Sequence, residues 1–127
     1  MLRAFAALLL LTTTVLADYR VIDGDTVAID GVSVRLQAID TPETHRSRCD
    51  NERALGLAAK ARLIALLDGK TVTYTANGTD RYGRTLGNVY ANGVDAGKQL
   101  LDEGLALPWR PGPQAKAARL AAWCHAG

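Results

Sequence analysis

Carboxylates recur at three separated points of this 127-residue chain, and the third of these segments also carries two arginines. The three segments are Asp23-Gly24-Asp25-Thr26, Asp40-Thr41-Pro42-Glu43 and Asp80-Arg81-Tyr82-Gly83-Arg84. Carboxylate oxygens bind hard metal ions, and the planar guanidinium group of arginine binds phosphate through two parallel hydrogen bonds. If the fold brings the segments together, a metal ion and a negatively charged substrate can meet in one site. Phosphodiester cleavage is therefore the first chemistry to test.

Asp25 and Asp40 are the candidate metal ligands. They flank two strand-like runs joined at Asp30-Gly31, a dipeptide typical of hairpin turns. Antiparallel pairing of these runs places Asp25 and Asp40 side by side, where two charged carboxylates need a cation. The main-chain carbonyl of Thr41 is the natural third ligand, with water filling the rest of the shell. Alternatively, Asp23 and Asp25 only form hydrogen bonds within a turn.

Glu43, Arg35 and Arg84 are the candidate catalytic residues. Glu43 lies three residues after Asp40, beyond a proline, so its carboxylate can orient or deprotonate a water molecule near the metal. Arg35 and Arg84 can stabilise the charge that builds on a phosphate in the transition state. The ordinary alternatives are loop capping for the glutamate and a surface salt bridge for each arginine.

The elements expected to position these residues are mostly strands. Strands are predicted at residues 19–22, 26–29, 32–39, 71–76 and 85–90, and helices at residues 52–67, 96–103 and 114–123. Within residues 32–39, alternation predicts one apolar face that ends with Ala38, while Arg35 and Ile39 face the other way. The order of elements predicts an α+β, mainly β fold, a five-stranded OB-fold barrel with about three helices.

The first long helix should bury one apolar stripe, and polar loops should flank it. The stripe consists of Leu55, Ala59, Leu63, Leu66 and Leu67. Residues 44–51 are predicted to form a loop, and residues 108–113 an exposed link. The chain has a net charge of +2, so its overall charge does not indicate a nucleic-acid binder. Any attraction for phosphate must come from a local cluster of arginines.

Residues 1–17 are predicted to be a secretory signal peptide. Arg3 supplies a basic start, an apolar run is centred on residues 8–11, and Ala17 precedes the expected cleavage point. A membrane anchor is the alternative, but the apolar run is shorter than the roughly 20 residues that span a bilayer. Residues 18–127 would then be a secreted or periplasmic single domain, monomeric and without stable membrane association.

Cys49 and Cys124 are predicted to form a disulfide, because an exported chain meets an oxidising environment. Such a bond would pin the C-terminal segment to the loop after Glu43. Two alternatives remain open: both thiols are free and buried, or they form a zinc site with His45 and His125.

The segments at residues 23–26, 40–43 and 80–84 resemble those of the thermonucleases, the staphylococcal-nuclease type of calcium-dependent nuclease. The similarity spans about residues 19–106 and also includes the segment Glu103-Gly104-Leu105-Ala106. The resemblance implies an OB-fold nuclease that cleaves DNA and RNA with little sequence preference and leaves 3′-phosphate ends. It implies that Ca²⁺ is bound by Asp25, Asp40 and the Thr41 carbonyl.

The resemblance also assigns roles to residues around the metal. Glu43 would act on the attacking water, and Arg35 and Arg84 on the scissile phosphate. Asp23 would lie close to the metal without binding it, and Arg81 and Tyr82 would contact the substrate. The chain departs from the well-known member in its shorter first hairpin, its cysteine pair and its lack of plain nucleotide-stacking tyrosines.

Two further questions remain open at this point. Trp109 could stack on a base in place of those tyrosines, or could simply pack within the C-terminal segment. The rival function from another class is a non-catalytic OB module that binds nucleic acid or protein. Such a module would be expected to lack at least one of the five residues Asp25, Arg35, Asp40, Glu43 and Arg84, and all five are present.

Overall fold

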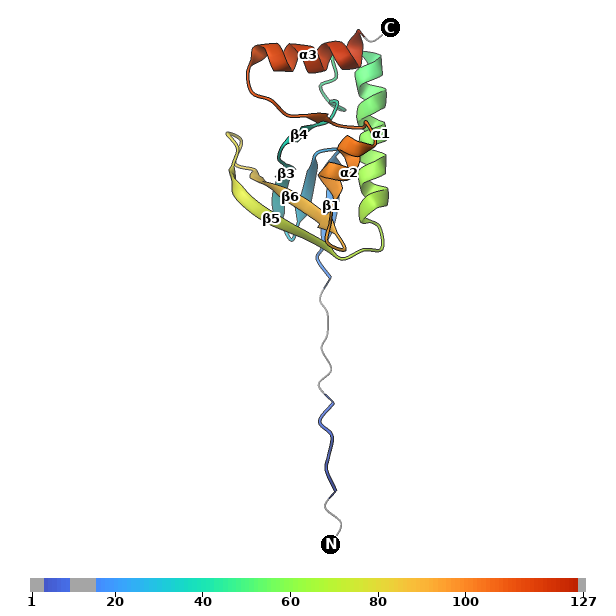
Figure 1. The fold of residues 1–127 in the computed structure, drawn as a ribbon, viewed down its shortest axis with the longest axis vertical. Coiled ribbons are helices and arrows are strands. Elements are labelled where there is room, and N and C mark those ends of the chain that lie inside the picture. Colours follow the sequence, from blue (N-terminus) through green and yellow to red (C-terminus); the bar gives the residue numbers. More distant parts are fainter. Residues whose placement is uncertain (1–3, 10–15, 126–127) are drawn as a thin grey trace.

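The computed structural model describes residues 4–9 and 16–125 (Figure 1). Its strands are β1 (Tyr19–Asp23), β2 (Thr26–Ile29), β3 (Val32–Leu36), β4 (Ile39–Asp40), β5 (Val72–Thr79), β6 (Thr85–Ala91), β7 (Val94–Asp95) and β8 (Leu107–Pro108). Its helices are α1 (Asp50–Leu67), α2 (Ala96–Asp102) and α3 (Pro113–Cys124). The predicted fold class, mainly β with three helices, is confirmed.

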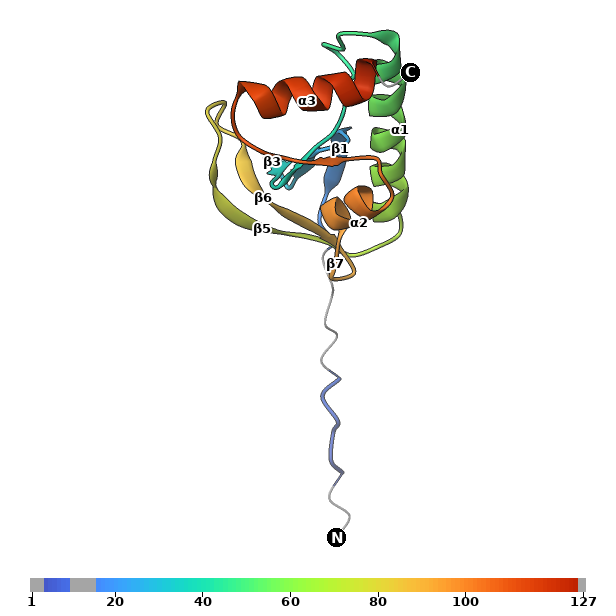
Figure 2. The ribbon, with the colours of Figure 1, turned by 45° about the horizontal axis from the view of Figure 1, so that its top comes forward.

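The five long strands form one sheet in the order β1-β2-β3-β6-β5, with the short β7 paired to β6. The pairings are antiparallel except between β3 and β6, which are parallel. This is the strand arrangement of an OB fold. Within residues 16–125 no ladder joins β1 to β5, so the barrel is open along that seam. Helix α1 runs along one side of the sheet, and α3 lies across one end of it (Figures 1 and 2).

The first hairpin forms as the Asp30-Gly31 signal predicts. Asp30 and Gly31 have φ values of 48° and 81°, the positive angles that a two-residue hairpin turn requires. Thr26 pairs with Arg35, and the backbone N–H of Leu36 donates to the carbonyl of Asp25 at 2.8 Å. Asp25 and Arg35 therefore sit at the same end of the β2–β3 ladder.

The predicted strand over residues 32–39 is interrupted, and the prediction for its last residues is wrong. The chain turns at Gln37-Ala38, where Ala38 has a φ of 66°, and the alternation of faces shifts by one residue. Ile39 is consequently 2% exposed, whereas Ala38 is exposed. After this turn β4 pairs with β8, with Asp40 opposite Leu107. Asp40 is thus held by a second small ladder.

Helix α1 buries the stripe that its apolar spacing predicts. Ala59, Leu63 and Leu67 are fully buried, and Leu66 packs at the edge of the core. The helix begins two residues earlier than predicted because Cys49 caps it, its Sγ accepting from the backbone N–H of Glu52 at 3.2 Å. This start shortens the loop after Glu43.

Cys49 and Cys124 are joined in a disulfide with a Cα–Cα distance of 5.9 Å, across 75 positions of sequence. The prediction of a disulfide is confirmed, and neither thiol is available for zinc. The bond ties the end of α3 to the start of α1.

The predicted signal segment, residues 1–17, lies partly outside the described residues. Phe5, Leu8 and Leu9 within it are exposed and add nothing to the core. No helix within the described part of the chain is long and apolar enough to cross a membrane.

Candidate active site

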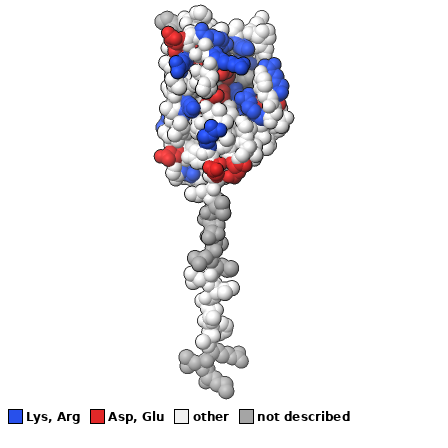
Figure 3. Space-filling view, turned by 180° about the vertical axis from the view of Figure 1, so that it is seen from behind, with Lys and Arg blue, Asp and Glu red and all other residues white. Residues whose placement is uncertain are grey.

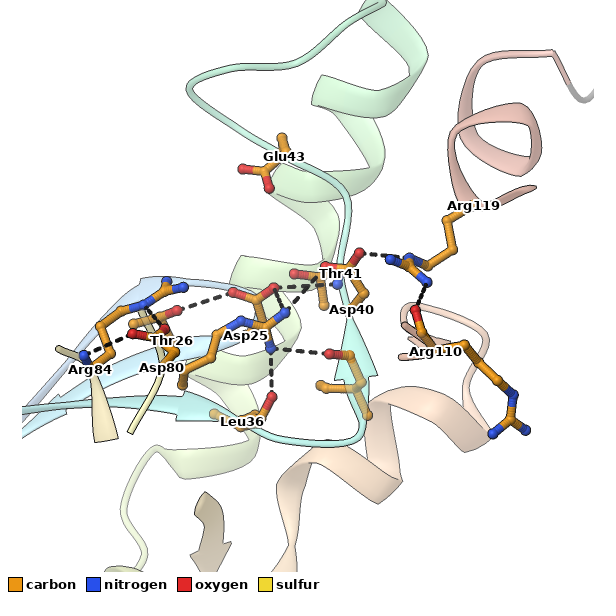
Figure 4. Close-up of polar contacts among 12 residues, drawn as sticks. Asp25, Thr26, Leu36, Asp40, Thr41, Glu43, Asp80, Arg84, Arg110 and Arg119 are labelled. Carbon is orange, nitrogen blue, oxygen red and sulfur yellow. Dashed lines mark hydrogen bonds and ion pairs between the residues drawn. The ribbon is translucent and has the colours of Figure 1, made fainter. Parts of the chain in front are cut away.

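The two predicted metal ligands, Asp25 and Asp40, are neighbours in Figure 4, and the guanidinium group of Arg35 contacts both. Arg35 Nη2 is 3.4 Å from Asp25 Oδ2 and 3.3 Å from Asp40 Oδ1. Its other terminal nitrogen donates to the backbone carbonyls of Leu36 and Ile39, across the turn between β3 and β4. The hairpin and the turn therefore bring together two carboxylates that are 15 positions apart in the sequence, with a cationic group between them.

The residues around Asp25 suit a hard cation. The Thr41 backbone N–H donates to Asp25 Oδ2 at 3.4 Å, and the hydroxyl of Thr26 donates to Asp25 Oδ1 at 3.1 Å. Among the described residues Thr41 Oγ1, buried next to Gly24, has no hydrogen-bond partner, so it is an oxygen that can still bind a donor or a cation. In the described residues no three His, Cys, Asp or Glu side chains form a metal cluster. A metal here would need main-chain and water oxygens beside the two carboxylates, as the sequence predicts.

Burial raises the pKa of Asp40 above its ordinary value. Arg35 opposes this shift, Asp25 adds to it, and Arg119 also opposes it. Burial therefore disfavours the charged form of Asp40 even with two arginines beside it. A divalent cation would favour that charged form.

Glu43 lies on the exposed loop that follows β4, and a buried glutamate on α1 holds its backbone. Glu52 is 0% exposed, and its Oε2 accepts from the backbone N–H of Glu43 at 3.3 Å. Glu52 also accepts from the backbone and side chain of Arg48, at 2.7 to 3.1 Å. One carboxylate thus fastens both ends of the Glu43–Arg48 loop to the first turn of α1.

Replacing Glu52 with Gln is expected to destabilise the protein by about 2 kcal/mol at pH 7, the usual worth of charged hydrogen bonds in a buried site. Burial opposes the charged form of Glu52, but the bonds from Arg48 and Glu43 outweigh it and lower its pKa from 4.5. Unfolding then takes up a proton, so this stabilisation is complete above pH 4.5 and is lost as pH falls through the lowered pKa. Urea unfolding of both proteins between pH 3 and pH 8 measures it.

Glu103→Gln is the matched control for this comparison. Glu103 also pairs with an arginine, Arg62 at 2.7 Å, but its side chain is 31% exposed. Its loss should cost less than about 1 kcal/mol. Equal losses for the two variants at every pH would contradict the anchoring role of Glu52.

Gly56 lies one turn after Glu52 on the same face of α1, directly under the loop that carries Glu43. A Cβ atom at Gly56 would lie 2.6 Å from the carbonyl oxygen of Pro42 and 3.0 Å from that of Glu43. The buried face of α1 therefore has two halves. Glu52 and Gly56 support the site loop, and the apolar residues that follow enter the core.

Replacing Gly56 with Ala is expected to lower the turnover of phosphodiester cleavage, the chemistry that the sequence predicts, about 100-fold, since a shift of about 1 Å in a positioned group can have that effect. Alanine favours helix by about 1 kcal/mol over glycine, but displacing two backbone carbonyls costs about 1–3 kcal/mol. The variant should therefore also lose stability. Turnover and thermal midpoint are the measurements.

Gly97→Ala is the control for Gly56→Ala, because Gly97 is a buried helix glycine in α2 whose added Cβ would meet side-chain atoms and no backbone. The nearest are a methyl group of Leu36 at 3.3 Å, Oδ1 of Asp95 at 3.4 Å and a methyl group of Ile39 at 3.6 Å. The control variant should keep turnover near the wild-type value. A Gly56→Ala protein with wild-type turnover would show that the loop does not depend on this contact.

Asp23 lies beside the site, as predicted, and its contact is with the loop. Its Oδ1 accepts from the hydroxyl of Thr44 at 2.7 Å, which links the end of β1 to the residue after Glu43. Gly24 allows this close approach, because a Cβ there would lie 2.9 Å from that of Ala59 and 3.0 Å from Thr41 Oγ1.

Arg84 lies at the start of β6, next to the β3 strand that carries Arg35. Thr85 pairs with Val34 and Leu86 with Arg35, so the parallel ladder brings the Asp80–Arg84 loop to the same side of the sheet. Asp80 orients Arg84, with Oδ2 accepting from its Nε at 2.6 Å and Oδ1 from its backbone N–H. In Figure 4 Arg84 and Asp80 lie on the other side of Asp25 from Arg119.

Arg81 and Tyr82, the predicted substrate contacts, form the exposed rim of the same loop. The guanidinium groups of Arg81 and Arg84 lie 4.9 Å and 5.5 Å from the centre of the Tyr82 ring. Trp109 is exposed, and its backbone N–H donates to Ala38. Figure 3 shows the molecule from behind the view of Figure 1. In the upper half of that face, acidic side chains are bordered by basic ones.

The structure brings the predicted site residues Asp25, Arg35 and Asp40 together, and sequence reasoning missed three residues around them. Glu52 could have been found from its place three residues after the helix cap, the position of the acidic residue in a capping box. Gly56, a glycine inside a helix, signals close backbone packing. Arg119 on α3 donates to Asp40 Oδ2 at 2.8 Å, and an alanine-rich helix gives no sign of that.

Comparison with known proteins agrees with this arrangement. Residues 33–124 match the family described as staphylococcal nuclease homologue. A micrococcal nuclease from Shigella flexneri is 36% identical over 129 residues, covering 86% of this chain and 70% of that protein. A staphylococcal-like nuclease from Arabidopsis thaliana is 31% identical and covers 87% of this chain. An uncharacterised 38.1 kDa protein from Capnoides sempervirens is 34% identical.

The chain spans 30% and 32% of the lengths of the Capnoides and Arabidopsis proteins. The family match begins after Asp25, whereas the three pairwise similarities cover 84% or more of the chain.

Proposed function

The chain belongs to the staphylococcal nuclease family, and on that premise we propose that it is a calcium-dependent nuclease that hydrolyses phosphodiester bonds of DNA and RNA. The observation that carries the proposal is the meeting of Asp25, Asp40 and Arg35 within 3.4 Å at the end of the first hairpin. Two carboxylates for a hard cation, with arginines for phosphate beside them, match phosphodiester chemistry. The products carry 3′-phosphate ends.

Each residue of the site has a separate task in this proposal. Asp25, Asp40 and the Thr41 carbonyl would hold Ca²⁺, which would act as a Lewis acid on the phosphate. Glu43 orients and deprotonates the attacking water. Arg35 and Arg84 bind the phosphate oxygens, and Asp80 holds Arg84 in place. Arg81 and Tyr82 contact the substrate at the rim.

Plasmid DNA and single-stranded RNA incubated with the purified protein test this function. We expect both to be degraded with Ca²⁺ and to survive in the presence of a chelator. A 3′-phosphate end blocks extension by a DNA polymerase until a phosphatase has removed it. The Asp25→Asn, Asp40→Asn double variant, purified identically, controls for contaminating nuclease. Intact nucleic acid under all metal conditions, with binding retained, would instead favour a non-catalytic OB module.

We further propose that residues 1–17 are removed on export and that the domain acts as a monomer outside the cytoplasm. Expression of the full chain in a bacterial host, followed by mass spectrometry of the periplasmic fraction, tests export. A mature protein that begins at Asp18 is expected. Recovery only of a cytoplasmic protein that keeps residues 1–17 would refute it.

A further inference from the structure

Arg119 is a buried arginine that the proposed reaction does not use. It lies in the middle of α3 and is 9% exposed. Its Nε donates to Asp40 Oδ2 at 2.8 Å, and its Nη1 donates to the backbone carbonyl of Arg110 at 3.1 Å (Figure 4). A buried guanidinium needs partners of this kind, and its two partners lie on β4 and on the segment between β8 and α3.

The two oxygens of Asp40 are divided between two arginines. Arg119 binds Oδ2, and Arg35 Nη2 lies 3.3 Å from Oδ1, close to Asp25 as well. The contact with Arg119 therefore fixes the rotation of the carboxylate and directs Oδ1 toward Asp25. It does so at Asp40, the residue that the short β4–β8 ladder holds.

Helix α3 is itself fastened at its far end. The disulfide joins Cys124 to Cys49 at the start of α1, and Asn51 Nδ2 donates to the carbonyl of Trp123 at 2.6 Å. At its near end, the bond from Arg119 to the Arg110 carbonyl holds the segment that leads from β8 into the helix. Arg119 is thus presented to Asp40 from a helix held on both sides.

We propose that Arg119 is a positioning residue for the metal site, and that α3 is therefore part of that site. The inference rests on the proposed binding of Ca²⁺ by Asp25 and Asp40. Arg119 acts through Asp40 and does not touch the substrate. Partners that orient metal-binding side chains typically change metal affinity 10- to 100-fold when they are removed.

The positive charge of Arg119 works in the opposite direction, because it repels a cation held nearby. The two effects predict opposite results for a neutral replacement. If orientation dominates, Arg119→Gln weakens calcium binding; if charge dominates, the same change strengthens it. Arg119→Lys keeps the charge, but a single ammonium group cannot reproduce the planar guanidinium that binds both Asp40 and the Arg110 carbonyl.

Calorimetric titration of the full-length protein with Ca²⁺ separates these cases. We expect Arg119→Gln to weaken calcium binding at least tenfold and Arg119→Lys to recover only part of it. Nuclease turnover of Arg119→Gln should be low at limiting Ca²⁺ and should return toward the wild-type value at saturating Ca²⁺. Arg62→Gln is the control, because it removes a different arginine–carboxylate pair, with Glu103 at 2.7 Å, from another part of the molecule.

Unchanged or tighter calcium binding in Arg119→Gln would overturn the inference, even if its thermal midpoint falls, because it would leave Arg119 a purely structural role. A wild-type protein that binds no Ca²⁺ would overturn the proposed calcium dependence and this inference together. The wild-type titration therefore distinguishes the two failures.

Discussion

Replacing Arg84 with Ala is expected to lower kcat for DNA hydrolysis about 1000-fold, with a much smaller change in KM. Groups that bind the charge developing in a transition state are worth about 10²–10³ in rate, and arginines that act on phosphate can exceed this. Asp80 holds the Nε edge of Arg84 at 2.6 Å, which leaves its terminal nitrogens to bind a phosphate. Steady-state kinetics at saturating Ca²⁺ measures the effect.

Arg84→Lys makes this test more specific, since it keeps the positive charge and removes the planar guanidinium group. Lysine has one nitrogen with which to serve both Asp80 and the substrate, so it should recover only a small part of the lost rate. Arg20→Ala, on the exposed face of β1, is the control for loss of a basic residue and should keep kcat. If Arg84→Ala changed KM alone, Arg84 would be a residue for substrate binding and not for catalysis.

The sequence predicted the sheet well because its signals are local. Short apolar and β-branched runs between turn residues marked the long strands, and Asp30-Gly31 fixed the register that brings Asp25 to Arg35. The turn at Ala38 was missed because alanine rarely adopts a positive φ, and nothing in its type announces one. That one residue decides that Ile39, and not Ala38, enters the core.

The supports of the site were harder to predict because they depend on tertiary contacts. Glu52 and Gly56 are ordinary members of a helix until the Pro42–Thr44 backbone is placed against them. Arg119 reaches Asp40 across 79 positions of sequence, and its partner follows from the docking of α3. The residues proposed to do chemistry could thus be proposed from their types and spacing. For Glu52 and Gly56 the sequence gives a signal but not the loop that they hold, and for Arg119 it gives neither.

The contacts of Glu52, Asp23 and Gly56 also explain how the loop that carries Glu43 stays in place although the carboxylates around it repel one another. Burial raises the pKa of Glu43 above 4.5, and the carboxylates of Asp25, Asp40, Asp23 and Glu52 raise it further. Five carboxylates around one loop repel one another at neutral pH. The loop donates hydrogen bonds to Glu52 and Asp23 and packs on Gly56. These contacts hold the loop in place against the repulsion.

Replacing Glu43 with Gln should therefore have two opposite effects. Turnover is expected to fall about 1000-fold, since a lost general base typically costs 10²–10⁴ in rate. The thermal midpoint of the protein in chelator at pH 7 is expected to rise, because the change removes one of the mutually repelling charges. Nuclease kinetics and calorimetry of the same two preparations measure both.

The pH dependence of the stability gain identifies its cause. Because the folded pKa of Glu43 lies above its ordinary 4.5, the charged form destabilises the fold at neutral pH. As pH falls through the raised pKa, Glu43 takes up a proton and the penalty disappears, so the midpoints of the wild type and Glu43→Gln should converge below about pH 4.5. Glu103→Gln, which breaks an exposed pair, should keep turnover and should not raise the midpoint. A rise that persisted unchanged at low pH would mean that the removed charge is not its source, and full activity in Glu43→Gln would assign the attacking water to another residue.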